Sequence, residues 1–204
     1  MKGVSTPKTV STPHGPARVH LHVTPDARGA LVLGHGAGGG VGAPDLVVAR
    51  DTALGLGFSV ALVEQPYRVA GRRSPAPAHQ LDTAWLAVLA GLRAGELAGL
   101  PLVTGGRSSG ARVACRTATA GDAAGVLCLA FPVHPPGKPE KDRLDELKLP
   151  TVPVLVVQGE RDPFGMPPRA RGRRVVVVAG DHGLKADLPA VARAVRTWLR
   201  ALLA

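Results

Sequence analysis

Ser108 lies at the centre of a Gly-x-Ser-x-Gly pattern that it forms with Gly106 and Gly110. A predicted strand begins at Pro101 and ends at this pattern, and a predicted helix follows it. In such a strand-turn-helix unit, a strained turn lifts the serine hydroxyl above the carboxyl edge of a parallel sheet, and the glycines let the two backbones approach. The spacing favours Ser108 over Ser109 as a nucleophile. The alternative is a helix start that is merely rich in glycine and serine.

An aspartate and then a histidine follow Ser108 in the chain, each just after a predicted strand. Asp162 follows the strand expected over 152–159, and His182 follows the strand expected over 174–180. Parallel strands end at one edge of a sheet, so we expect the three side chains to meet there. Ser108 would attack a carbonyl carbon, His182 would accept its proton, and Asp162 would orient the imidazole.

Other acids and histidines offer alternatives for two of these roles. Asp181 and Glu160 are the alternative acids, and His134 and His35 are the alternative bases. We interpret His35 as a residue that braces its loop, because it precedes a run of glycines directly after a strand.

The glycine-rich stretch over 35–40 follows an apolar run over 29–34 that is typical of a strand buried on both faces. A phosphate cradle is one interpretation, but the stretch contains neither Gly-x-Gly-x-x-Gly nor the lysine of a P-loop. The other is an oxyanion loop whose free N–H groups face the oxygen that becomes charged during acyl transfer. The sequence thus predicts an oxyanion hole from the N–H of Ser109 and that of Ala37 or Gly38.

Four further side chains are candidates for substrate binding, because they lie in loops that follow predicted strands or beside the nucleophile: Tyr67, Arg68, Arg107 and His134. Arg72 and Arg73 stand in the same loop as Tyr67. A guanidinium there would hold a carboxylate or phosphate on the substrate. The alternative is that all these arginines are solvated or paired with nearby acids.

Composition indicates one folded domain over 1–204, in which 1–16 is irregular or an edge strand. The chain has 204 residues, of which 45% are hydrophobic and 20% charged. No apolar run approaches the roughly 20 residues that span a bilayer, and the start lacks the apolar core of a signal peptide. We therefore expect a cytoplasmic protein without membrane contact, a monomer or homodimer.

Cys115 and Cys128 have no metal-ligand spacing and are expected to be buried thiols, so we expect neither metal nor cofactor.

The formal net charge of +10 makes nucleic acid a candidate partner. The arginines are spread over several segments, however, and aromatic residues, which would stack on bases, make up only 3% of the chain. We therefore expect no nucleic-acid binding. The expected partner is a small-molecule ester, and the sequence does not decide whether that ester is neutral or anionic.

Predicted strands alternate with predicted helices along the chain, which indicates the α/β class: a mostly parallel sheet with helices on both faces. Further strands are expected over 17–23, 58–63 and 125–131, and helices over 44–56, 79–93, 111–120 and 184–203. Only about 20 residues separate Phe131 from Val152, too few for an inserted helical lid domain.

Several segments together resemble one family. The stretches at 33–39, 105–112, 131–139, 158–165 and 180–182 are similar to the small bacterial dienelactone-hydrolase-like α/β-hydrolases, a group related to the testis-expressed and NSL-complex-subunit hydrolase-like proteins. The resemblance covers nearly the whole chain from about Val19. It implies a compact α/β-hydrolase fold and a serine hydrolase with Ser108, Asp162 and His182 as its triad. The chain departs from the family at Ser109, where a bulkier residue such as methionine is expected, and at Ala111, where many members have glycine.

The resemblance implies an esterase-type enzyme acting on carboxylic esters. A thioesterase, an amidase or an acyltransferase would use the same site. A non-catalytic interaction module on this scaffold is the alternative from another class, and loss of a triad residue would favour it.

Overall fold

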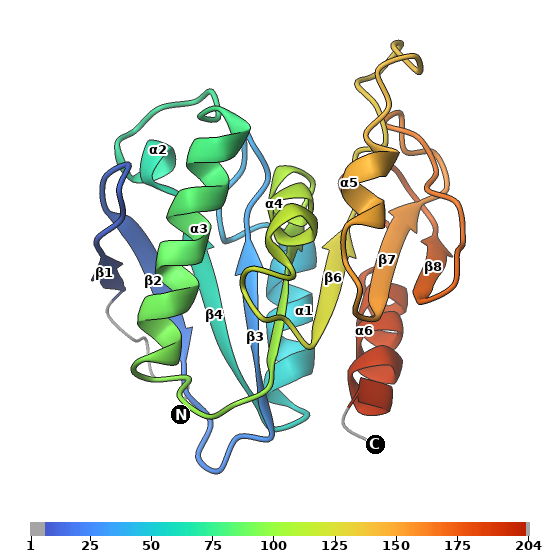
Figure 1. Ribbon diagram of the computed structural model, residues 1–204. Coiled ribbons are helices and arrows are strands. Elements are labelled where there is room, and N and C mark those ends of the chain that lie inside the picture. The colour runs from blue at the N-terminus through green and yellow to red at the C-terminus, as the bar shows by residue number, and fades with distance from the viewer. Residues whose placement is uncertain (1–6, 203–204) are drawn as a thin grey trace.

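The computed structural model describes residues 7–202, and its centre is an eight-stranded sheet in the order β1-β2-β4-β3-β5-β6-β7-β8 (Figure 1). The strands are β1 Lys8–Val10, β2 Ala17–His22, β3 Gly29–Gly34, β4 Phe58–Glu64, β5 Leu102–Arg107, β6 Gly125–Leu129, β7 Val154–Gly159 and β8 Arg173–Val178. β2 is antiparallel to β1 and β4, and every other neighbouring pair is parallel. The predicted mostly parallel sheet is confirmed.

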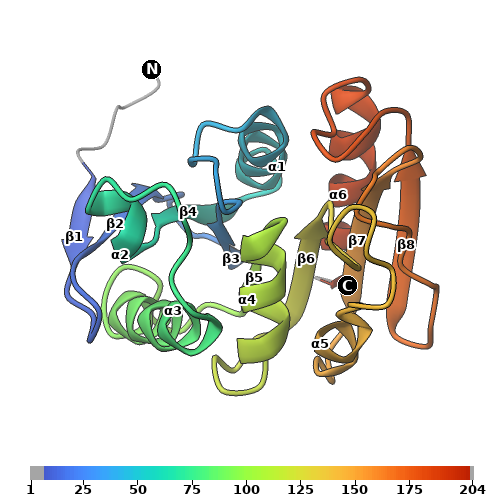
Figure 2. The same ribbon diagram turned by 90° about the horizontal axis from the view of Figure 1, so that it is seen from above.

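Helices cover both faces of the sheet, as the sequence predicts. They are α1 Pro44–Leu54, α2 Pro66–Val69, α3 Ala78–Arg93, α4 Ser109–Thr117, α5 Leu144–Lys148 and α6 Leu188–Leu202. α1 and α6 lie on one face, and α3, α4 and α5 lie on the other (Figure 2). All residues of β3, β6 and β7 are buried between these layers, which explains why β3 and β6 are apolar throughout and why β7 is apolar except for Gln158.

The order of the strands creates a switch point between β3 and β5. From β3 the chain moves outward to β4, on the side of β2, and it then returns to place β5 on the other side of β3. In open α/β sheets, ligands bind in the crevice at the carboxyl ends of strands where the winding reverses. The predicted oxyanion loop follows β3 and Ser108 follows β5, so both lie at this point.

Element boundaries differ from the sequence prediction in a few places. The helix after the elbow begins at Ser109 instead of residue 111, and α2 and α5, each of five residues or fewer, are not predicted from the sequence. The last helix begins at Leu188 instead of residue 184, because Leu184 has φ +50° and the Asp187 carboxylate accepts the Ala190 N–H at 2.8 Å as a cap. β1 lies within 1–16, the segment for which the sequence predicts either irregular structure or an edge strand.

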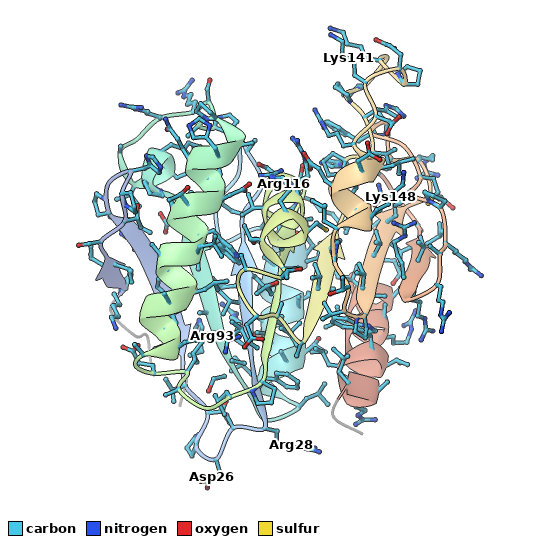
Figure 3. All side chains as sticks on the ribbon, in the orientation of Figure 1. Asp26, Arg28, Arg93, Arg116, Lys141 and Lys148 are labelled. Carbon is cyan, nitrogen blue, oxygen red and sulfur yellow. The ribbon has the colours of Figure 1, made fainter. Side chains whose placement is uncertain are left out.

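Ion pairs join the helices on one face of the sheet. Arg116, labelled in Figure 3, projects from α4 and donates two hydrogen bonds to Asp82 of α3 and one to Glu146 of α5. Arg112, one turn earlier, donates two more to Glu146. These arginines therefore hold the helix that follows Ser108 between its two neighbours.

The two cysteines are free thiols, both buried, as expected. Their Sγ atoms lie 3.5 Å apart, between α4 and β6. The contact with Cys115, together with burial, raises the pKa of the Cys128 thiol well above its usual value.

Candidate active site

Ser108 occupies a sharp turn between β5 and α4 with φ 53° and ψ −110°. Residues other than glycine seldom adopt such a backbone conformation, which persists only where the surroundings enforce it. The surroundings here are close backbones: a Cβ on Gly106 or on Gly110 would lie 2.5 Å from the Gly34 carbonyl oxygen. The glycines of the pattern are therefore required by the approach of β5 and α4 to the end of β3.

Ser108, His182 and Asp162 form one continuous chain of hydrogen bonds. Ser108 Oγ lies 2.9 Å from His182 Nε2, and His182 Nδ1 lies 2.8 Å from Asp162 Oδ2. The side chain of Asp162 is fully buried, whereas that of His182 is 17% exposed. A nucleophile, a base that contacts it and an acid that contacts the base are the parts that acyl transfer through a serine requires.

Two residues that the sequence does not single out, Gln158 and Phe164, hold the side chains of Asp162 and His182 in place. Gln158, fully buried near the end of β7, donates from Nε2 to Asp162 Oδ2 at 2.8 Å, and also to the Phe131 and Gly165 carbonyls. The ring of Phe164 stacks on the His182 imidazole with centroids 4.1 Å apart. The one sequence feature that could have pointed to these two residues is the glutamine at 158, inside the otherwise apolar strand β7.

Asp162 is held by a third donor as well. The Phe164 N–H donates to Asp162 Oδ1 at 2.9 Å. With the contacts from His182 and Gln158, both oxygens of this buried carboxylate have partners. The Asp162 carboxylate is therefore an acceptor with a fixed orientation toward the histidine.

The glycine-rich loop after β3 lies directly against Ser108, since a Cβ on Gly36 would be 3.5 Å from the Ser108 Cβ. Neither Ala37 nor Gly38 donates its N–H to another residue within 7–202. Ser109 is the first residue of α4, a position whose N–H has no acceptor inside the helix. The three N–H groups selected from the sequence thus have no acceptor among residues 7–202, and they lie in the segments that flank Ser108.

Two aromatic side chains shape the glycine-rich loop. His35 is buried, contacts the Gly36 carbonyl through Nδ1 at 2.8 Å and accepts the Gln65 N–H on Nε2 at 3.1 Å. Burial lowers its pKa, and both of its ring nitrogens are engaged away from Ser108. Tyr67 donates its hydroxyl to the Ala37 carbonyl at 2.9 Å, and burial raises its pKa to about 12. His35 thus braces the loop, and the hydroxyl of Tyr67 is engaged by the protein.

Arg107 connects three parts of the site. Its Nε forms an ion pair with the fully buried Asp45 of α1 at 3.0 Å, and its Nη2 donates to the His182 carbonyl at 2.9 Å. A Cβ on Gly36 would lie 3.0 Å from its Nη1. Burial raises the pKa of Asp45, and Arg107 opposes that rise. The guanidinium is therefore engaged by protein groups on several sides, although the sequence proposes it as a substrate contact.

The remaining candidates lie around the site without joining the chain of hydrogen bonds. His134 contacts the Pro135 carbonyl through Nδ1 at 2.9 Å. It belongs to the segment between β6 and α5, which extends above α5 to Lys141 (Figure 3). Arg68 donates to the Arg72 carbonyl at 3.3 Å.

The two alternative acids point elsewhere. Asp181 is exposed and accepts the N–H of Gly183 at 2.8 Å, and Glu160 is exposed and pairs with Arg161. The acid that contacts His182 Nδ1 is Asp162.

We predict that Arg107 matters for both stability and turnover. Arg107→Gln would leave the Asp45 carboxylate buried without a counter-charge, which costs roughly 3–5 kcal/mol of unfolding free energy. It would also release the His182 carbonyl and lower kcat on the order of 10- to 100-fold. Asp45→Asn combined with Arg107→Gln should recover much of the stability but not kcat. Chemical denaturation and ester assays on the native protein and the two variants measure the stability and kcat. Recovery of kcat in the double variant would contradict a positioning role.

No group of three or more histidine, cysteine or acidic side chains within residues 7–202 is arranged to hold a metal ion. None of the helices described is both long enough and apolar enough to cross a membrane.

Comparison with known proteins agrees with this architecture. A family model described as alpha/beta hydrolase domain matches residues 27–188. Among curated proteins, none matches the sequence.

Solved structures resemble the whole chain at low identity. A serine hydrolase without a lid from Xanthomonas campestris is 20% identical with a TM-score of 0.80, over 98% of this chain and 96% of that one. Est1E from Butyrivibrio proteoclasticus is 15% identical with a TM-score of 0.78, over 97% and 99%. A dienelactone hydrolase from Anabaena variabilis is 16% identical with a TM-score of 0.74, over 96% of each chain. At such identities the likeness concerns the fold.

Proposed function

Because the chain belongs to the alpha/beta hydrolase domain family, we propose that it is a serine hydrolase that cleaves carboxylic esters through an acyl-enzyme on Ser108. The observation that carries the proposal is the contact of 2.9 Å between Ser108 Oγ and His182 Nε2, backed by the buried Asp162. The description of the Xanthomonas neighbour as a serine hydrolase supports the same chemistry.

In the proposed first half-reaction, Ser108 Oγ bonds to the ester carbonyl carbon while its proton passes to His182 Nε2. The carbonyl oxygen becomes an oxyanion, which the N–H groups of Ser109 and of Ala37 or Gly38 would stabilise. The intermediate then collapses: the bond to the alcohol oxygen breaks, and His182 protonates that oxygen as the alcohol leaves.

Water completes the cycle in the second half-reaction. It gives one proton to His182 Nε2 as its oxygen bonds to the acyl carbon, and the bond to Ser108 Oγ then breaks as the proton returns to that oxygen. The acid is released. Asp162 stays ionised throughout and stabilises the imidazolium that forms twice.

The proposed substrates have short acyl chains. The segment 130–153 between β6 and β7 contains only the five-residue helix α5, and the Xanthomonas neighbour is likewise a serine hydrolase without a lid. A site without an inserted lid domain offers little apolar surface to a long chain.

A series of 4-nitrophenyl esters from acetate to palmitate tests this proposal, with Ser108→Ala measuring background hydrolysis. We expect kcat/KM to be highest for acetate or butyrate, to fall for chains of twelve carbons or more, and to show no rise at the micellar threshold. A matched thioester and anilide separate the esterase from the thioesterase and the amidase. Turnover no faster than that of Ser108→Ala on every compound would favour the non-catalytic module.

A further inference from the structure

Residues of the segment that connects α2 to α3 line a hollow of about 480 Å³. This segment lies at the carboxyl edge of the sheet (Figure 1). We name the cavity the basic hollow; it is lined by Tyr67, residues 72–77 and Gln80. Its volume is within the range of small-molecule sites. The site chemistry described above uses only the hydroxyl of Tyr67 and leaves the hollow without a role.

The basic hollow carries uncompensated positive charge. Arg72 and Arg73 line it, and neither forms an ion pair with any other residue in the described part of the chain. No acid occurs over 65–81. The flanking acids are already engaged: Glu64 pairs with Arg18 and His20, and Asp82 with Arg116. The two guanidinium groups are therefore available to an external anion.

A smaller recess of about 90 Å³ adjoins the basic hollow and shares with it the lining residues Tyr67, Arg72, Ala76 and Gln80. The Gln65 side chain lines this recess and is 6% exposed. Its Nε2 donates to the Leu81 carbonyl, whereas its Oε1 has no hydrogen-bond partner among residues 7–202. An unsatisfied buried acceptor is costly, so the recess suits a hydrogen-bond donor from a ligand or its water.

Tyr67 links the basic hollow to the proposed chemistry. Tyr67 lines the hollow, and its hydroxyl donates to the Ala37 carbonyl in the loop that lies against Ser108. A molecule seated against Tyr67 is therefore next to the proposed oxyanion loop. The backbone of Arg72 is also fixed, because its N–H donates to the Tyr67 carbonyl and its own carbonyl accepts from Arg68.

We propose that the basic hollow is a subsite for a carboxylate or phosphate on the substrate, so that the protein prefers anionic esters. The inference rests on the proposed function. Arg72 and Arg73 bind the anion through charge-assisted hydrogen bonds, and the ester group of the same molecule reaches Ser108 past Tyr67.

Two matched substrate pairs place the anion on either side of the ester: monomethyl glutarate with methyl pentanoate, and 4-acetoxybenzoate with its methyl ester. We expect at least one anionic member to exceed its neutral partner about tenfold in kcat/KM, mainly through KM. The excess should shrink as salt rises from 0.1 to 1 M, where the Debye length falls from ~10 to ~3 Å.

Arg72→Ala with Arg73→Ala should abolish the preference while changing neutral-ester turnover less than about twofold, because the fixed backbone groups at Arg72 remain. Arg171→Ala with Arg174→Ala is the matched control, since it removes two exposed arginines next to and within β8. That control should keep the preference. Equal kcat/KM within both pairs, or equal loss in the control, would overturn the inference.

Binding without turnover separates this inference from the proposed function. Calorimetry on Ser108→Ala should detect monomethyl glutarate, and Arg72→Ala with Arg73→Ala in that background should weaken it about tenfold. Inorganic phosphate should compete with the anionic ester and leave the neutral ester unaffected; a change in neutral-ester turnover would indicate a separate effector site and overturn the inference. If neutral esters are turned over normally but no anion binds, the proposed subsite is wrong and the proposed function stands. If the native protein turns over no ester at all, the proposed function is wrong.

Discussion

Replacement of Ser108 by alanine is expected to reduce kcat on a short-chain ester by about 10⁶-fold, to the level that binding and the oxyanion donors alone sustain. The variant lacks the oxygen that lies 2.9 Å from His182 Nε2, so no acyl-enzyme forms. The fold should persist, because alanine retains the Cβ and the contacts that enforce the turn are made by Gly106 and Gly110. Progress curves at high enzyme concentration, with circular dichroism for the fold, measure both.

Ser109→Ala is the matched control for that variant. Ser109 is the neighbouring serine, and its proposed contribution is a backbone N–H that alanine also has. We expect kcat within about threefold of the native value, because alanine keeps this N–H and removes only a hydroxyl that has no hydrogen-bond partner among residues 7–202. Comparable losses in the two variants would contradict the assignment of the nucleophile.

Replacement of Asp162 by asparagine is expected to lower kcat by about 10⁴-fold with little change in KM. The carboxylate accepts from His182 Nδ1, Gln158 Nε2 and the Phe164 N–H. An asparagine must aim its NH₂ group at one of these donors. If it faces His182, the imidazole takes the other tautomer, and Nε2 then carries a hydrogen and cannot accept the Ser108 proton.

Asp181→Asn controls for the loss of a carboxylate near the same strand ends. Asp181 is exposed, and its carboxylate accepts the Gly183 N–H without contacting His182, so kcat should change less than about threefold. Steady-state kinetics over pH 6–9 on both variants provides the comparison. An Asp162→Asn protein with more than a tenth of the native kcat would show that this carboxylate does not orient the base.

The sequence predicts the central strands well and the short elements poorly. β3 begins and ends at the predicted residues 29 and 34, because a buried parallel strand is an unbroken apolar run between breakers. α2 and α5 are too short to develop a periodic pattern, and their formation depends on neighbours brought in by the tertiary structure.

In the candidate site, too, some residues can be predicted from the sequence and others cannot. The order and strand-end positions of Ser108, Asp162 and His182 suffice to place them together, because a parallel sheet aligns the carboxyl ends of its strands. The roles of Gln158 and Phe164 depend on side-chain directions around a turn, which spacing does not specify. For Arg107 the charge is visible in the sequence, but its buried partner Asp45 stands 62 positions away, at the start of α1.

The most direct measurement of the central claim is the site of covalent labelling by a fluorophosphonate probe, located by peptide mass spectrometry. Such a probe phosphonylates an activated serine with loss of fluoride, and it requires the same contact with the base as an ester does. We predict one adduct per chain on the peptide that contains Ser108, retained in Ser109→Ala and absent in Ser108→Ala. An adduct on any other residue of the native protein, or labelling of Ser108→Ala equal to that of the native protein, would contradict the account.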